Sequence, residues 1–326
     1  MILGSLEIFG SFWSFGGFEN MNKNTAGLIS GFGLILVTII WGVAFVVVKN
    51  ALDVIPAVYL VALRFTVATL GLCIVFAPRF AKLNKATFLH GLGIGIFLFL
   101  AYVFQTIGCK YTTAGKNAFL TTIYVILVPF INWILTKKRP DGYSVVAAVM
   151  SVVGIGLLSL RGDLSMNIGD VLTLICGLGF ALQIVFIARW SQEDDPILLA
   201  IIQIGVTAIC SWIFAPFIDG KLSFEMIKNP EVVRGVLFLA IFSTMICFLL
   251  QNICQKYLRP STAALLMSFE SVFGVLSGVI FLHEVMDLKG ILGCCLMFLA
   301  VVTSETKFSF LTEKMHKKSE ISVETE

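Results

Sequence analysis

A single carboxylate, Glu270, lies in the middle of an apolar run that extends from Gln251 to Glu284. A carboxylate at the centre of a membrane helix costs roughly 2.5 to 3.5 kcal/mol on insertion scales, so its presence indicates a functional role or an opposite charge beside it. Its chemistry would be to bind a proton or the ammonium group of a substrate. Glu270 is therefore the first candidate for a functional residue.

The arrangement around Glu270 occurs once more, earlier in the chain. A shift of 146 positions places Gln105 on Gln251 and Lys110-Tyr111 on Lys256-Tyr257. The same shift places a polar residue, Tyr124, on the acid Glu270. The repetition indicates two related halves, of which only the second carries an acid at this depth.

Further polar and aromatic side chains follow helical spacing within apolar segments. Asn117, Thr121 and Tyr124, continued by Val128 and Asn132, recur at steps of three and four and so share one helical face. The predicted substrate cavity comprises Trp41, Phe45, Gln105, Asn117, Thr121, Tyr124, Gln183, Gln251 and Glu270. The alternative is that the amides only join helices, through hydrogen bonds of about 0.6 kcal/mol each.

Arg64 is the one basic residue predicted to lie within a membrane span. Counted from the predicted helix ends at about 1.5 Å per residue, Arg64 and Glu270 differ in depth by only about 5 Å. Two hypotheses remain open for the pair. Either Glu270 couples transport to protons, or Arg64 and Glu270 form a structural ion pair.

The elements that position these residues follow from composition. Of 326 residues, 58% are hydrophobic and 13% are charged, and the mean hydropathy is +0.96, whereas soluble domains carry about 25% charged residues. About 20 apolar residues span a bilayer as a helix. This criterion predicts ten spans, at 27–48, 57–77, 88–108, 115–135, 142–160, 168–188, 197–217, 233–254, 261–282 and 288–304.

The predicted fold is an all-α polytopic membrane protein whose ten transmembrane helices form two inverted five-helix repeats, because an odd number of spans per half reverses the topology. The expected parts are an N-terminal leader at 1–26, a first repeat at 27–160, a second repeat at 161–304 and a cytoplasmic tail at 305–326. The first twenty residues do not resemble a signal peptide, because no basic residue precedes an apolar core. We expect Met21 to be a more natural start of the protein than Met1.

Orientation follows from the distribution of Lys and Arg, which favour the cytoplasmic side. With the N-terminus inside, 14 of them lie on the inner side and 8 on the outer side. Both termini are therefore predicted in the cytoplasm, in a protein of the cytoplasmic membrane. The end of the bundle that carries Lys49, Lys110 and Lys116 is the predicted outer end, and the opposite end is the inner end.

Signatures of enzymes and cofactor sites are missing from the sequence. His90, His283 and His316 lack metal-ligand spacing, and the GxG pairs lie within apolar spans and are followed by no GxxxxGK[ST] loop. The eight cysteines form no CxxC and are interpreted as buried apolar residues. We expect no cofactor, no metal and no nucleic-acid partner.

Several motifs together resemble the EamA-type branch of the drug/metabolite transporter superfamily, over residues 27–304. They are Trp41-Gly42 followed by Phe45 and Lys49, Arg64-Phe65, the segment from Gln105 to Tyr111, and FLHEVMDLKG at 281–290. The first repeat departs from the pattern, because Lys138 stands where Glu284 stands in the second.

The resemblance implies a ten-helix transporter whose central cavity is lined by spans 1, 3, 4, 6, 8 and 9, and whose 3–4 and 8–9 hairpins move to alternate access. Such proteins carry amino acids, other small metabolites or nucleotide-activated sugars. The candidate cavity holds mostly uncharged and aromatic groups, which favours a neutral or zwitterionic solute, since a phosphorylated one would require several Arg or Lys.

The leading hypothesis is secondary transport of a small amphipathic metabolite, such as an amino acid, with proton coupling through Glu270. The expected partners are this small-molecule substrate and the lipid bilayer. The alternatives are a membrane-embedded enzyme acting on lipid-linked substrates, which would need a cluster of His, Asp or Ser at one interface, and a scaffold or sensor that transports nothing.

Overall fold

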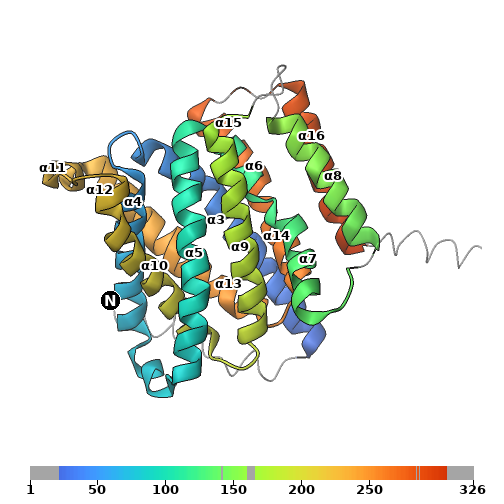
Figure 1. Ribbon diagram of the computed structural model, residues 1–326, viewed down its shortest axis with the longest axis horizontal. Coiled ribbons are helices and arrows are strands. Elements are labelled where there is room, and N and C mark those ends of the chain that lie inside the picture. The colour runs from blue at the N-terminus through green and yellow to red at the C-terminus, as the bar shows by residue number, and fades with distance from the viewer. Residues whose placement is uncertain (1–21, 141, 160–165, 284, 286, 307–326) are drawn as a thin grey trace, which may run out of the picture.

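The computed structural model describes residues 22–140, 142–159, 166–283, 285 and 287–306, so the predictions about Met21 and most of the C-terminal tail lie outside the described residues. Every regular element in this part of the chain is helical (Figure 1). The elements are α3 (Lys23–Ala51), α4 (Ala57–Val75), η1 (Ala77–Lys82), α5 (Lys85–Tyr111), α6 (Ala114–Thr121), α7 (Tyr124–Thr136), α8 (Gly142–Ser159), α9 (Ile168–Trp190), α10 (Pro196–Ile218), α11 (Phe224–Lys228), α12 (Pro230–Phe238), η2 (Leu239–Ile246), α13 (Cys247–Gln255), α14 (Pro260–Met267), α15 (Phe269–Leu282) and α16 (Leu288–Thr306).

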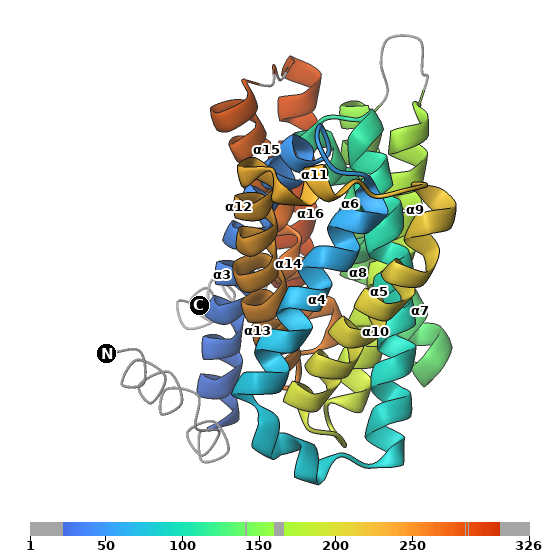
Figure 2. The same ribbon diagram turned by 90° about the vertical axis from the view of Figure 1, so that its left-hand side faces the viewer.

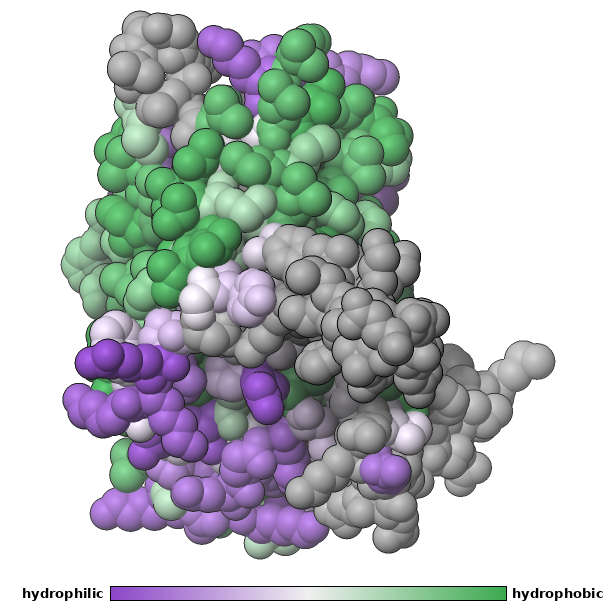
Figure 3. All heavy atoms as spheres, turned by 90° about the vertical axis from the view of Figure 1, so that its right-hand side faces the viewer, coloured by the Kyte–Doolittle hydropathy of each residue, from purple (hydrophilic) through white to green (hydrophobic). Residues whose placement is uncertain are grey.

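Ten apolar helical stretches lie within the described residues. Eight are long and apolar enough to cross a membrane, and two shorter ones, Val145–Gly154 and Leu288–Ala300, lie in α8 and α16. A broad hydrophobic band covers one face of the molecule, with hydrophilic residues gathered below it (Figure 3). The prediction of an all-α polytopic membrane protein is confirmed, and the ten stretches agree with the ten predicted spans.

Helices of one half pack on helices of the other half, and the contacts occur in equivalent pairs. α5 packs on α9, and the equivalent segment of the second half, α13, packs on α3. α10 likewise packs on α5 as η2 packs on α4, and α8 and α16 lie side by side at one edge of the bundle (Figures 1 and 2). This reciprocal packing is the arrangement expected of inverted repeats, which place a binding site where the two halves meet.

The fourth and ninth spans are each interrupted at the same place. α6 ends before Thr122 and α14 ends before Ser268, which are 146 positions apart. The Thr122 hydroxyl donates to the Phe119 carbonyl and the Ser268 hydroxyl donates to the Leu265 carbonyl, both at 2.7 Å. A hydroxyl that bonds to its own helix backbone competes with regular helical geometry. The breaks therefore have a local chemical cause that both halves share.

The eighth span contains a π-helical segment, η2, that the equivalent α5 lacks. Within it the Thr244 hydroxyl donates to the Leu239 carbonyl at 2.8 Å, and the Ser243 carbonyl accepts the indole N–H of Trp41 at 2.9 Å. π-helical turns are rare and occur frequently at functional sites. Here the segment points a serine and a threonine of one helix at the neighbouring α4.

Polar contacts fix the two ends of the bundle, and two of them involve lysines of the predicted outer end. Lys49 Nζ donates to the carbonyls of Cys109 and Thr112 at 2.8 and 2.7 Å, which caps the end of α5. Lys116 Nζ lies 2.7 Å from the buried Asp170 carboxylate. The positive charge of Lys49 stabilises the C-terminal end of a helix, and that of Lys116 neutralises a buried carboxylate.

The inner end holds a cluster of the kind that the enzyme hypothesis requires, formed by Thr87, His90 and Asp194. The Asp194 carboxylate accepts the Thr87 hydroxyl at 2.5 Å and lies 2.6 Å from His90 Nδ1. The His90 ring stacks on Trp190, with centroids 4.5 Å apart. These contacts join α5 to the turn between α9 and α10.

Candidate functional site

A cavity lies at the centre of the bundle, where the two halves meet; the space between its wall atoms is about 550 Å³ when the part open to solvent is included. It extends from the middle of the helices toward the predicted outer end, since Val48, Cys109 and Asn117 belong to its walls. The lining residues come from both halves: Trp41, Ala44, Phe45, Val48, Arg64, Tyr102, Gln105, Thr106, Cys109, Asn117, Tyr124, Phe180, Gln183, Ile184, Ser243, Gln251, Met267 and Glu270.

Glu270 lies at one end of the cavity and is paired with the residue that matches it in the first repeat. Its Oε1 accepts the Tyr124 hydroxyl at 2.9 Å, and Glu270 is only 4% exposed. The break before α15 places Glu270 in the first turn of that helix, where unpaired N–H groups favour a negative charge. The helix break therefore lowers the cost of burying the carboxylate.

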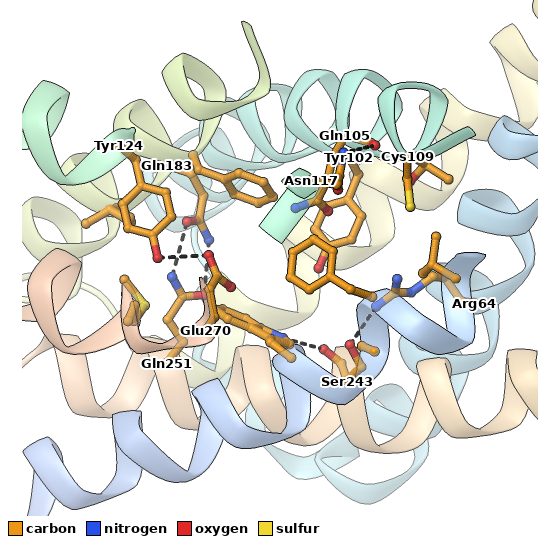
Figure 4. A pocket seen from close by; sticks show the side chains of 18 residues that line it. Arg64, Tyr102, Gln105, Cys109, Asn117, Tyr124, Gln183, Ser243, Gln251 and Glu270 are labelled. Carbon is orange, nitrogen blue, oxygen red and sulfur yellow. Dashed lines mark hydrogen bonds between the residues drawn. The ribbon is translucent and has the colours of Figure 1, made fainter. Parts of the chain in front are cut away.

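Gln183 and Gln251 lie beside Glu270 (Figure 4) and form an amide cluster with a third glutamine, Gln203. Gln183 Nε2 lies 3.1 Å from Gln203 Oε1, and Gln183 and Gln251 exchange hydrogen bonds of 3.3 and 3.2 Å. The three residues come from α9, α10 and α13, so the cluster joins helices of the second half. Amides donate and accept equally well, so the same groups can contact a polar solute that enters the cavity.

A second group of hydrogen-bonded polar residues lies on α5 and α6, and two of its members, Gln105 and Asn117, line the cavity. Gln105 Nε2 donates to the Thr121 hydroxyl at 3.1 Å, and Asn117 Nδ2 donates to the Thr173 hydroxyl at 2.7 Å. The buried Asn117 Oδ1 has no hydrogen-bond partner in the described part of the chain. A buried acceptor without a partner costs about 1 to 3 kcal/mol, which a ligand donor in the cavity would recover.

Arg64 lies at the far end of the cavity from Glu270 (Figure 4). Its Nε donates to the Thr244 hydroxyl and its Nη2 to the Ser243 hydroxyl, both at 2.9 Å. The guanidinium carbon lies 5.0 Å from the centre of the Tyr102 ring. Arg64 therefore depends on the π-helical segment and an aromatic face, and forms no ion pair with Glu270 in this structure.

Aromatic rings separate these polar ends. Tyr102 meets Phe180 edge to face with centroids 5.5 Å apart, and Trp41 lies 5.5 Å from Phe248. Such rings supply apolar walls with few rotatable bonds. The cavity thus combines an acidic end, a basic end and an apolar middle.

The structure gathers most of the residues that the sequence selected for the cavity. Eight of the nine line it, and the predicted partner Arg64 lines it as well. Thr121 does not line the cavity, because its hydroxyl is engaged by Gln105 and by the Asn117 carbonyl. The structure shows where these residues lie, and their roles in transport remain predictions.

The sequence analysis missed several lining residues. Tyr102, Thr106 and Cys109 share the helical face of Gln105, and the spacing of three and four would have found them. Ser243 had no such signal, because a π-helical turn changes which face a residue occupies.

The chain is similar to known transporters over most of its length. The sequence model of the EamA-like transporter family matches twice, at residues 28–160 and 167–305. An uncharacterized transporter of Archaeoglobus fulgidus is 38% identical over 287 residues, which cover 88% of this chain and 88% of that protein. The threonine/homoserine exporter RhtA of Escherichia coli is 30% identical over 244 residues, which cover 72% of this chain and 77% of RhtA.

A solved crystal structure shares the fold, with a TM-score of 0.67 at 18% sequence identity. The match covers 89% of this chain and 99% of that one. The similarity supports the ten-helix architecture only.

Proposed function

The chain belongs to the EamA-like transporter family, and from this premise we propose that it carries a small amphipathic metabolite, in the first place a neutral amino acid, across the cytoplasmic membrane. Transport would proceed by alternating access, driven by a proton gradient through Glu270. Both termini would lie in the cytoplasm, as the distribution of Lys and Arg predicts.

The observation that carries the proposal is the buried Glu270 at the end of a cavity that both repeats build. An intramembrane carboxylate that faces a cavity is the usual site of proton or substrate binding in transporters. The remaining walls are amide, hydroxyl and aromatic groups with one arginine. A neutral or zwitterionic solute fits this lining, whereas a phosphorylated one would need more cations.

The names of relatives point in the same direction. RhtA of Escherichia coli and of Salmonella typhimurium is a threonine/homoserine exporter, which makes threonine and homoserine the first substrates to test.

Flux in proteoliposomes tests the proposal directly. The purified protein should exchange labelled threonine or homoserine faster than protein-free liposomes do, and the rate should change when a pH gradient is imposed. Failure to carry any neutral amino acid would refute the substrate class. Flux that ignores the pH gradient would refute proton coupling and leave the substrate class standing.

The two helix breaks provide a test of alternating access. In the double variant Thr122→Val and Ser268→Ala, both bonds to the helix backbone are lost. Because each such bond contributes about 0.5 to 1.5 kcal/mol and about 1.4 kcal/mol corresponds to tenfold, we expect turnover to fall about 5-fold or more with substrate affinity unchanged. The measurement is the initial flux across a range of substrate concentrations.

Thr136→Val provides the matched control, since Thr136 also bonds to its own helix, at 2.7 Å from the Asn132 carbonyl, but lies exposed at the end of α7. It should turn over as the wild type does. Equal turnover of the double variant and this control would contradict a hinge at Thr122 and Ser268.

A further inference from the structure

One oxygen atom in the wall of the cavity has no hydrogen-bond partner. Asn117 lines the cavity and is 0% exposed, and its Oδ1 accepts no hydrogen bond from the described residues. Buried polar atoms of native proteins are almost always bonded, so an unpaired one requires an explanation. The amides of Gln183 and Gln251 in the same cavity differ in this respect, because they exchange hydrogen bonds with each other.

The orientation of the Asn117 amide follows from its neighbours. Its Nδ2 donates to the Gln105 carbonyl at 3.2 Å and to the Thr173 hydroxyl at 2.7 Å. The Thr173 hydroxyl donates its own hydrogen to the Gly169 carbonyl at 2.6 Å, so toward Asn117 it acts as an acceptor. The reversed amide would place an oxygen against two acceptors. The nitrogen is therefore fixed on these two groups, and the oxygen is left for another donor.

The nitrogen is engaged behind the wall of the cavity. Thr173 does not line the cavity. It lies where α5 and α9 meet, since a Cβ at Gly108 would come within 2.6 Å of the Thr173 hydroxyl. With both N–H groups bonded there, Oδ1 is the polar atom of Asn117 that remains for a solute.

Gln105 lies beside Asn117 and is oriented in the same way (Figure 4). Its Nε2 donates to the Thr121 hydroxyl at 3.1 Å, and that hydroxyl donates to the Asn117 carbonyl at 2.9 Å. Thr121 does not line the cavity, whereas Gln105 does and is half-buried. No donor in the described part of the chain bonds to Gln105 Oε1. This part of the wall therefore offers acceptors to a solute.

The donor that fits these acceptors is a neutral hydroxyl group. Both acceptors are uncharged amide oxygens, and Ala114 and Ala118, which flank Asn117 on α6, pack with Phe45 in an apolar cluster. A charged ammonium group would lose far more hydration in such surroundings than a hydroxyl group does.

We propose that Asn117 selects solutes that carry a hydroxyl group, whose O–H donates to Oδ1, with Gln105 Oε1 as the second acceptor of the same subsite. The inference rests on the proposed function and deepens it, because it names a side-chain group of the transported amino acid. The subsite is separate from Glu270. Asn117 precedes Tyr124, the partner of Glu270, by seven residues, or about 10 Å of helix, and no group of the solute is required to reach both.

The competing explanation is that Asn117 only joins α6 to α5 and α9. Both explanations expect flux to fall when Asn117 is replaced. They differ in which solutes are affected, because a purely structural role lowers the flux of all solutes alike, whereas a binding role concerns those with a hydroxyl group.

The test measures inhibition of labelled threonine flux by unlabelled threonine, valine and 2-aminobutyrate. Valine carries a methyl group in place of the hydroxyl, and 2-aminobutyrate lacks the hydroxyl altogether. In the wild type, threonine should inhibit at concentrations at least about tenfold lower than either analogue, because the analogues leave a buried acceptor unpaired. In Asn117→Leu the three compounds should inhibit about equally.

Asn132→Leu is the matched control. It makes the same substitution further along the same helical face, at a residue that does not line the cavity, and should keep the wild-type preference. Thermal unfolding in detergent shows whether each variant is folded. Where Asn117→Leu is not, Gln105→Leu takes its place and should lose the preference as well.

Equal inhibition by threonine and valine in the wild type would overturn the inference and leave amino-acid transport intact. An unchanged preference for threonine in the folded variant would do the same. Absence of flux for every neutral amino acid in the wild type would overturn the proposed function together with the inference.

Discussion

Replacing Glu270 by glutamine is expected to reduce flux at low substrate concentration about 30-fold or more. Glutamine has the same size and still accepts the Tyr124 hydroxyl, so the loss isolates the charge. The charge removed is the one that would meet the proton or the ammonium group of the substrate. Removing one member of such a buried charged pair costs roughly 2 to 5 kcal/mol, and about 1.4 kcal/mol corresponds to a tenfold change in rate. Any flux that remains should no longer respond to an imposed pH gradient.

Two further variants are compared with Glu270→Gln. Tyr124→Phe keeps the carboxylate and removes a hydrogen bond worth about 0.5 to 1.5 kcal/mol, so its flux should fall much less. Glu231→Gln removes an exposed acid in the first turn of α12 that does not line the cavity, and it should behave as the wild type. Wild-type flux and pH response in Glu270→Gln would remove Glu270 from the mechanism.

Substituting alanine for Gly42 is expected to destabilise the protein strongly. A Cβ at Gly42 would meet the Phe273 side chain, the Phe273 carbonyl carbon at 2.7 Å and the Gly274 nitrogen at 2.9 Å. Backbone atoms of α15 cannot move aside as a flexible side chain can. Overpacking of this kind costs about 1 to 3 kcal/mol or more, so the midpoint of thermal unfolding in detergent should fall by several degrees.

Gly27→Ala is the matched control on the same helix, because a Cβ there meets nothing within 4 Å. Alanine in an unobstructed helix position is favoured over glycine by about 0.5 to 1 kcal/mol. Gly27→Ala should therefore unfold at or slightly above the wild-type temperature. Equal unfolding temperatures for the two variants would show that α3 and α15 are not in close contact in the membrane.

A second close contact shows that Gly274, near Glu270, serves packing. A Cβ at Gly274 would collide with the Ala118 side chain, so this glycine seats α15 against α6. Small residues allow membrane helices to approach closely. The small residue thus fixes how Tyr124 and Glu270 face each other across the two halves.

The sequence by itself determined the spans, the two-fold repetition and most of the cavity. Spans are readable because each membrane helix must satisfy its own backbone hydrogen bonds and match the thickness of the bilayer, which are local requirements. Polar residues such as Gln105, Gln183 and Gln251 were readable for a related reason, since a polar group in a lipid environment has to face the interior of the bundle.

Only the tertiary structure decided how the charges are arranged. Depth along the membrane normal allowed Arg64 and Glu270 to pair, yet Arg64 bonds to Ser243 and Thr244 and Glu270 bonds to Tyr124. These partners are 146 to 180 positions apart in the chain, and no periodicity within one helix encodes which side chains of different helices meet. The rotation of helices about their axes, set by the π-helical turn and by the close glycine contacts, separates the two charges and leaves one at each end of the cavity.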